Sequence, residues 1–242
     1  MPRPKMGRPS VKRAPAGHGE GRTIPVEPSL AKGVESSDRR EYRRANEYLN
    51  WQMTAADYDA GPDFAGHPMR LEDVHKFIKP HLEIPRDAVV VDLATGTGHA
   101  FEHMLKEYKP KRVIGVDWAS EMLKVARGKK RISHAVLADV SQIPLKTGSA
   151  DFVSAIDGHA IRSVDPDTAF KEIHRILKPG MQALVTVPYT PGLVSAEEAK
   201  AFMDDDYPTR HIREAGLDII KADIIRTRTG HEIVVLARKP GK

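Results

Sequence analysis

The sequence predicts a doubly wound α/β fold, with a mostly parallel seven-stranded sheet and an antiparallel C-terminal hairpin at one edge. Between residues 88 and 188, short apolar runs alternate with amphipathic helical stretches. This order is typical of parallel strands that are covered by helices on both faces. The chain then ends in two apolar runs that flank Arg228-Thr229-Gly230, which indicates a hairpin.

The first 37 residues are predicted to be a disordered basic tail. They are rich in Pro, Gly, Arg and Lys and have no apolar period, so they cannot bury enough surface to offset the entropy of ordering. Residues 1–44 hold 11 Lys and Arg against 5 Asp and Glu, and the rest of the chain holds 27 against 28. The excess positive charge therefore lies in the tail, and the folded part is near neutral.

One folded domain is expected over residues 38–242. Residues 38–84 are predicted to form N-terminal capping helices, because apolar residues recur at helical spacing over 39–56 and 69–82 before Pro85. Residues 85–242 are the predicted α/β core. Its strands are expected at 88–93, 112–117, 133–139, 151–156, 182–187, 218–226 and 231–237, and its helices at 99–108, 120–127 and 166–177. Lys178-Pro179-Gly180 is the predicted stop of the last helix.

Composition narrows the class of protein. The chain has no cysteine, which excludes disulfides, thiolate zinc sites and cysteine nucleophiles. It has no apolar window of the roughly 20 residues that a membrane span needs, and no apolar signal segment at its start. A cytoplasmic protein is therefore expected. A mitochondrial transit peptide is the alternative, because no acidic residue precedes Glu20.

The first core strand ends in a candidate ligand-binding turn, Val91-Asp92-Leu93-Ala94-Thr95-Gly96-Thr97-Gly98. Ligands of an open parallel sheet bind beyond the carboxyl ends of its strands. Gly96 and Gly98 allow a tight turn and a close approach of the backbone to a ligand. Asp92 places a carboxylate at the tip of the strand. An ordinary strand-to-helix turn is the competing interpretation.

A dinucleotide-binding fingerprint does not fit this turn. Its third glycine would fall at Phe101 when counted from Gly96 and Gly98, or at His99 when counted from Ala94 and Gly96. That glycine lets helix and strand pack closely around a pyrophosphate. The phosphate-binding pattern G-x-x-x-x-G-K-[ST] does not occur either. The turn therefore favours an adenosine ligand without phosphates.

Acidic residues end the next two predicted strands. Asp117 lies 21 residues after Gly96, where a carboxylate can accept both hydroxyls of a ribose. Trp118 follows and offers an aromatic wall for a purine. Asp139 ends the third strand, where it can accept a hydrogen bond from an exocyclic amine. Acids at three successive strand ends point to one adenosine site.

Four segments resemble, in order, the motifs of the class I S-adenosylmethionine-dependent methyltransferases. They are VVVDLATGTGHA, VIGVDWASEML, LADVSQIPLKTGSADFVSAI and FKEIHRILKPGMQALVTVP. The resemblance is to the type 11 branch, which includes ubiquinone and menaquinone biosynthesis methyltransferases. It implies a Rossmann-like fold and S-adenosyl-L-methionine as the cofactor.

The resemblance also assigns roles to cofactor-binding residues. The motif glycines and the acid at Asp92 would surround the methionyl part of the cofactor, with Ala94 in place of the commonest first glycine. Asp117 would hold the ribose, and the pair Asp139-Val140 would read adenine. Tyr58 resembles the aromatic lid of the family.

The segment after the fourth strand supplies candidate catalytic residues. A sulfonium methyl group is already activated, so the protein mainly has to align the acceptor. His159 and Asp157 are candidate bases for an acceptor that must lose a proton, and Arg162 is a candidate clamp for an acidic substrate. Each has an ordinary polar loop residue as its alternative. No metal is expected, and His99 and His103 are interpreted as surface histidines.

A small-molecule acceptor is expected, such as a quinone precursor or a polyketide-like phenol. The loop after the fifth strand, over 190–209, carries Asp204-Asp205-Asp206, which would repel a nucleic-acid backbone. An RNA or protein acceptor recruited by the basic tail is the second hypothesis. The third is a non-catalytic subunit of an RNA–protein assembly that keeps the methyltransferase fold. The sequence indicates neither a membrane span nor an oligomeric state.

Overall fold

The computed structural model describes residues 52, 55, 57, 58, 67–156, 166–189, 208–228 and 230–241. All of them belong to one unit, Glu41–Lys242. The tail and most of the first capping helix lie outside the described residues, so these two expectations stay predictions. None of the helices in the described part reaches the length and apolar character that crossing a membrane requires.

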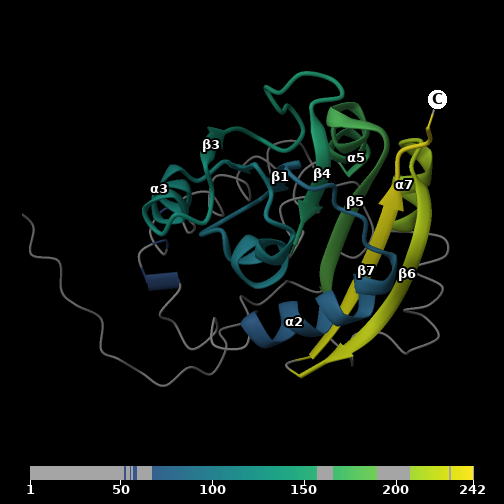
Figure 1. The fold of residues 1–242 in the computed structure, drawn as a ribbon, viewed down its shortest axis with the longest axis horizontal. Coiled ribbons are helices and arrows are strands. Elements are labelled where there is room, and N and C mark those ends of the chain that lie inside the picture. Colours follow the sequence, from purple (N-terminus) through teal and green to yellow (C-terminus); the bar gives the residue numbers. More distant parts are fainter. Residues whose placement is uncertain are drawn as a thin grey trace, which may run out of the picture. The chain divides into compact units, whose positions relative to one another are not determined.

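A seven-stranded sheet forms the centre of the described part of the chain (Figure 1). Its strands, in the spatial order β3-β2-β1-β4-β5-β7-β6, are β3 His134–Leu137, β2 Arg112–Asp117, β1 Val89–Leu93, β4 Ala150–Ala155, β5 Leu177–Tyr189, β7 Gly230–Arg238 and β6 Asp218–Thr227. Strands β1 to β5 pair in parallel, whereas β7 pairs antiparallel with both β5 and β6. The predicted fold class is therefore confirmed, including the hairpin at the edge.

Helices cover both faces of the sheet because successive strand side chains point to opposite sides. One face packs against helices α5 (Pro166–Ile176) and α7 (Thr209–Glu214), and its buried strand residues include Val91, Val153, Val185 and Val235. The other face packs against α2 (His67–Ile78) and the helical segment after β1, and includes Val90, Phe152, Leu184 and Val234. Helix α3 (Ser120–Gly128) contacts β2 and β3.

The helical stretch predicted over 99–108 is confirmed, but its hydrogen-bonding pattern is irregular. The chain is helical from His99, forms a π-helix (η4) at Phe101–Leu105, and tightens to a 3₁₀ turn (η5) at Lys106–Tyr108. Lys109 then ends the segment with a left-handed φ of 47°. Apolar spacing indicates a helix, but it does not distinguish hydrogen-bonding patterns that differ by one residue.

Lys178-Pro179-Gly180 has a second role that the sequence analysis did not predict. Helix α5 ends at Ile176, close to the predicted end, but these three residues already belong to β5. Gly180 N–H donates to the Lys239 carbonyl at 2.9 Å, and Lys239 N–H donates to the Met181 carbonyl at 2.9 Å. Bonds to the far end of the chain therefore extend this strand beyond the predicted 182–187. Helix α7, which begins at the end of the expected loop, is also new.

Candidate active site

The turn after β1 passes through three residues with positive φ. Ala94, Gly96 and Gly98 have φ values of 51°, 51° and 83°, a region that glycine adopts without strain. Unlike the two glycines, Ala94 has a Cβ, so its positive φ costs roughly 1 kcal/mol or more of backbone strain. Among the described residues, no heavy atom lies within 4 Å of the position that a Cβ on Gly96 would take. The described part of the turn therefore leaves space for a ligand beside Gly96.

Asp92 lies at the end of β1, beneath this turn, and its side chain is buried. Thr95 Oγ1 donates to one carboxylate oxygen at 2.5 Å, and Ser154 Oγ donates to the other at 2.7 Å. Burial raises the pKa of Asp92 from 3.8 to about 6, and the Asp117 carboxylate adds to this rise, while the two hydrogen bonds oppose it. Ser154, which pairs in register with Asp92, was not predicted. A serine inside the apolar run of the fourth strand was the available signal.

Asp117 ends β2 and holds the turn from the side. One carboxylate oxygen accepts the Gly96 N–H at 2.8 Å, and the other accepts the Ala119 N–H at 2.8 Å. Burial raises the pKa of Asp117 above its usual value, and these backbone bonds oppose the rise. The structure therefore brings together the glycine turn and the second strand-end acid, 21 residues apart.

Aromatic residues gather next to Asp117. Trp118 and Tyr58 are partly buried and pack against the same small cluster of Ala55, Ala119 and Met122. The side-chain carbonyl of Gln52 accepts the Glu121 N–H at 2.9 Å, which satisfies a backbone donor in the first turn of α3. The capping segment thus contacts the first turn of α3, just after β2, and the lid role of Tyr58 stays a prediction. Gln52 was not predicted.

Asp139 and Val140 follow β3, which is shorter than predicted and ends at Leu137. One Asp139 oxygen accepts both the Ser141 N–H at 2.8 Å and the Ser141 hydroxyl at 2.7 Å. Val140 is buried in the core beneath the sheet edge. The Asp139 carboxylate thus holds the loop that follows β3.

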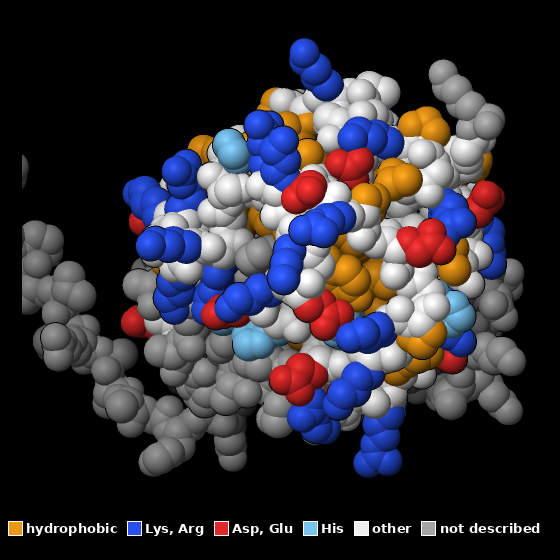
Figure 2. Space-filling view, viewed as in Figure 1, with side chains coloured by type: hydrophobic (Ala, Val, Ile, Leu, Met, Phe, Trp, Pro, Cys, Tyr) orange, Lys and Arg blue, Asp and Glu red, His pale blue; other side chains and the backbone are white. Residues whose placement is uncertain are grey.

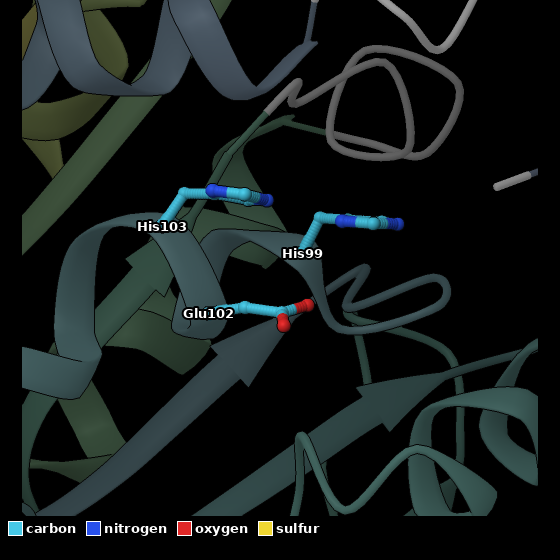
Figure 3. A group of neighbouring side chains, drawn as sticks. All are labelled: His99, Glu102 and His103. Atoms are coloured by element: carbon cyan, nitrogen blue, oxygen red, sulfur yellow. The ribbon is translucent and has the colours of Figure 1, made fainter.

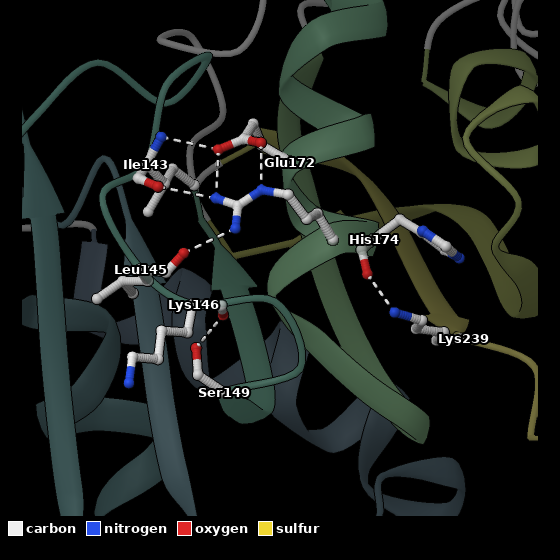
Figure 4. A network of polar contacts seen from close by, with 8 residues as sticks. Ile143, Leu145, Lys146, Ser149, Glu172, His174 and Lys239 are labelled. Carbon is white, nitrogen blue, oxygen red and sulfur yellow. Dashed lines mark hydrogen bonds and ion pairs between the residues drawn. The ribbon is translucent and has the colours of Figure 1, made fainter.

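A guanidinium network fixes the chain after Val140 (Figure 4). Arg175 on α5 forms two bonds to Glu172, at 2.6 and 2.7 Å, and donates to the carbonyls of Leu145 and Ile143 at 2.7 and 2.8 Å. Glu172 accepts the Ile143 N–H at 2.8 Å in return. Hydrogen bonding to Arg175 lowers the pKa of Glu172, and that to Glu172 raises the pKa of Arg175. Helix α5 therefore anchors the segment that follows the Asp139-Val140 pair.

The candidate catalytic residues Asp157, His159 and Arg162 lie outside the described residues, as does most of the loop over 190–209. Strand β4 ends at Ala155, beside β1 in the sheet. The segment that carries these three residues therefore begins at the same sheet edge as the glycine turn.

His99 is not the surface histidine that the sequence analysis expected, because only 8% of it is exposed. His99, Glu102 and His103 lie together in the helical segment after the turn (Figure 3), with their potential ligand atoms within 4.8 Å of one another. Arg131, however, donates to Glu102 at 2.6 Å and lies 2.9 Å from Nε2 of His99. A permanently charged guanidinium thus binds two of the three groups, and disfavours a metal ion there.

The described residues at this edge suit an adenosine ligand with positive charge. The described residues leave space beside Gly96, and Asp117 is bonded to its N–H. Trp118, which follows Asp117, belongs to an aromatic cluster. Asp92 beneath the turn and Asp117 beside it place two acids next to this turn, which favours a sulfonium or ammonium group and disfavours a pyrophosphate. The sheet order and this arrangement agree with the resemblance to the class I S-adenosylmethionine-dependent methyltransferases.

Comparison with known proteins agrees with this class. Residues 91–185 match the family model described as "Methyltransferase domain". The chain is 26% identical to the uncharacterized methyltransferase YdaC of Bacillus subtilis over 183 residues, which cover 73% of this chain and 98% of that protein. It is 32% identical to the ubiquinone/menaquinone biosynthesis C-methyltransferase UbiE of Rubrivivax gelatinosus over 171 residues, 69% of this chain and 65% of that protein. It spans about a third of the malonyl-[acyl-carrier protein] O-methyltransferase of Marinomonas sp..

A solved structure shows the same fold. The 1,6-didemethyltoxoflavin-N1-methyltransferase of Burkholderia thailandensis, with bound 1,6-didemethyltoxoflavin and S-adenosylhomocysteine, matches with a TM-score of 0.59 at 18% identity. The match covers 87% of this chain and 93% of that one. The chain is therefore similar to the S-adenosylmethionine-dependent methyltransferases: residues 91–185 match a methyltransferase domain, and the solved structure shares the fold.

Proposed function

We propose that the chain transfers a methyl group from S-adenosylmethionine to a small-molecule acceptor by in-line displacement, with the cofactor at the turn after β1. The observation that carries this proposal is the bond from Gly96 N–H to the Asp117 carboxylate at 2.8 Å, which joins the glycine turn to the ribose-binding candidate. A carboxylate has about four acceptor positions. Ribose hydroxyls can therefore bind Asp117 in addition to the backbone.

The other cofactor contacts follow from the same geometry. Trp118 would flank the purine, and Tyr58 would cover it from the capping segment. Asp139 and Val140 would meet the adenine edge. Ala94, Gly98 and the buried Asp92 would surround the methionyl part, where a negative charge favours the sulfonium.

The cofactor supplies a methyl group that is bonded to a positively charged sulfur. When the methyl group moves to the acceptor, the S–C bond breaks and the sulfur becomes a neutral thioether. The protein therefore has to orient the acceptor and exclude water. In this proposal His159 or Asp157 takes the proton that a hydroxyl or carbon acid loses. Arg162 would bind an acidic group of the acceptor.

Three observations favour a small-molecule acceptor. The relatives include a quinone-biosynthesis C-methyltransferase, and a structural neighbour was solved with a small heteroaromatic compound. Residues 45–242 hold 27 basic against 28 acidic residues. On the face seen in Figure 2, acidic side chains lie among the basic ones, unlike the single-sign stripe of many nucleic-acid enzymes. An RNA or protein acceptor recruited by the tail is the alternative.

Calorimetry followed by an acceptor screen tests the proposal. The protein should bind S-adenosylmethionine and S-adenosylhomocysteine and give no heat with NAD. Labelled methyl transfer to quinols and phenols should exceed transfer to RNA and to protein. NAD binding without S-adenosylmethionine binding would contradict the cofactor site. Transfer to RNA that is lost when residues 1–37 are removed would establish the alternative acceptor.

A further inference from the structure

Arg131 reaches from the start of the segment before β3 to the turn after β1. Its Nη1 donates to the Thr97 carbonyl at 3.1 Å, and the same nitrogen lies 2.9 Å from Nε2 of His99. Its Nε donates to Glu102 at 2.6 Å. The Arg131 side chain is only 11% exposed. A single guanidinium therefore connects the turn to the first helical residues that follow it.

These bonds fix one peptide group of the turn at both ends. The carbonyl of Thr97 accepts from Arg131, and the N–H of Gly98, in the same peptide group, donates to the Thr95 carbonyl at 2.8 Å. The Arg131 Cβ would stand 2.8 Å from a Cβ on Gly98, so the arginine also packs directly on the turn. Its contacts are thus both polar and steric.

The opposite side of the turn is held by Asp117 through Gly96. The turn therefore lies between Asp117 on β2, which is 21 residues from Gly96, and Arg131 before β3, which is 34 residues from Thr97. Both bonds are made by groups of the protein itself, so they can order the turn without a contribution from a ligand. Ordering a loop in advance reduces the entropy that binding would otherwise cost.

We propose that Arg131 is a positioning residue that presets the cofactor-binding turn through the Thr97 carbonyl, with Glu102 and His99 aiming the guanidinium. Arginine suits this role because its donors have a fixed planar geometry and it keeps its charge. Its charge is balanced by Glu102, whose carboxylate pKa is lowered by Arg131 against the effect of burial. The inference rests on the proposed placement of the cofactor at this turn.

The test compares Arg131→Gln, Arg131→Lys and the matched control Arg127→Gln. Arg127 lies four residues earlier on α3 and its side chain is exposed, so the control removes the same charge without touching the turn. Arg131→Gln should raise the Kd for S-adenosylmethionine about tenfold, because a charged hydrogen bond to the turn is lost. Arg131→Lys should stay within about threefold of Arg131→Gln, since one ammonium cannot reproduce the planar set of donors.

Amide exchange in the ligand-free protein gives a second readout that needs no cofactor. Exchange at Gly98 should speed up by about tenfold in Arg131→Gln and remain unchanged in Arg127→Gln. A normal Kd with normal exchange in Arg131→Gln would overturn the proposal. Full recovery of affinity in Arg131→Lys would also overturn it, because charge alone would then explain the effect.

A folding defect in Arg131→Gln and a lack of cofactor binding in the wild type need further measurements. If Arg131→Gln does not fold, Glu102→Gln replaces it. This variant releases the guanidinium and should raise the Kd about threefold, and an unchanged Kd would overturn the proposal. A wild-type protein that shows no S-adenosylmethionine binding would contradict the proposed cofactor site, while Gly98 exchange would still test what Arg131 does to the turn.

Discussion

Substitution of Asp92 by Asn should change how the stability of the protein depends on pH. The Asp92 side chain is 1% exposed, and burial raises its pKa to about 6. The folded state therefore holds the carboxyl proton more tightly than the unfolded state does. The stability that this proton contributes is complete below the unfolded pKa of 3.8 and is lost as the pH rises through about 6.

The size of the change in the free energy of unfolding follows from the shift in the pKa of Asp92. A rise from 3.8 to about 6 corresponds to about 3 kcal/mol, at about 1.4 kcal/mol per pKa unit. Asparagine has nearly the same shape and does not ionise. Its amide group also changes the bonds to Thr95 and Ser154, but that change is independent of pH. The free energy of unfolding of Asp92→Asn, relative to wild type, should therefore rise by about 2–3 kcal/mol between pH 4 and pH 8.

Urea denaturation at a series of pH values measures this difference. Subtracting the wild-type curve removes the contribution of the other titrating groups, which both proteins share. Asp218→Asn, at an exposed position at the start of β6, is the matched control, because it makes the same carboxylate-to-amide change on the surface. A flat difference for Asp92→Asn would refute the argument, because Asp92 would then ionise at the same pH in both states.

Three further predictions concern Asp117, Arg175 and the tail. Asp117→Asn should raise the Kd for S-adenosylmethionine about tenfold or more in calorimetry, because an amide replaces one charged acceptor, and unchanged affinity would contradict a role in the site. Arg175→Gln should lower the free energy of unfolding by about 1–3 kcal/mol in urea, because it breaks the bonds to Glu172 and to two carbonyls; a loss below about 0.5 kcal/mol would show that solvent replaces them. Removal of residues 1–37 should leave the Kd and the melting temperature unchanged, and earlier melting of the truncated protein would place part of the tail on the domain.

Local sequence was sufficient to predict the strands, and the structure confirms them. Apolar runs bounded by polar residues mark β1, β2 and β4 to within a residue, because strands buried on both faces have little freedom in composition. The full extent of β5, and the order in which the two hairpin strands follow it across the sheet, depend instead on pairing with β7 and on the bonds to Lys239, which a local pattern does not encode. The local pattern likewise indicates only a helix stop at Lys178-Pro179-Gly180. These residues also belong to β5, because the strand is extended by bonds to the distant Lys239.

The sequence also predicted where the candidate site lies, because ligands of such sheets bind at the carboxyl ends of the strands. It placed Asp92, Gly96 and Asp117 there by position alone. Only the tertiary structure decided how they are held. Ser154 reaches Asp92 across 62 residues and Arg131 reaches the Thr97 carbonyl across 34, and neither contact follows any periodicity. The buried state of Asp92, and hence its raised pKa, is likewise a property of the packed sheet, because desolvation depends on neighbours that chain folding brings together.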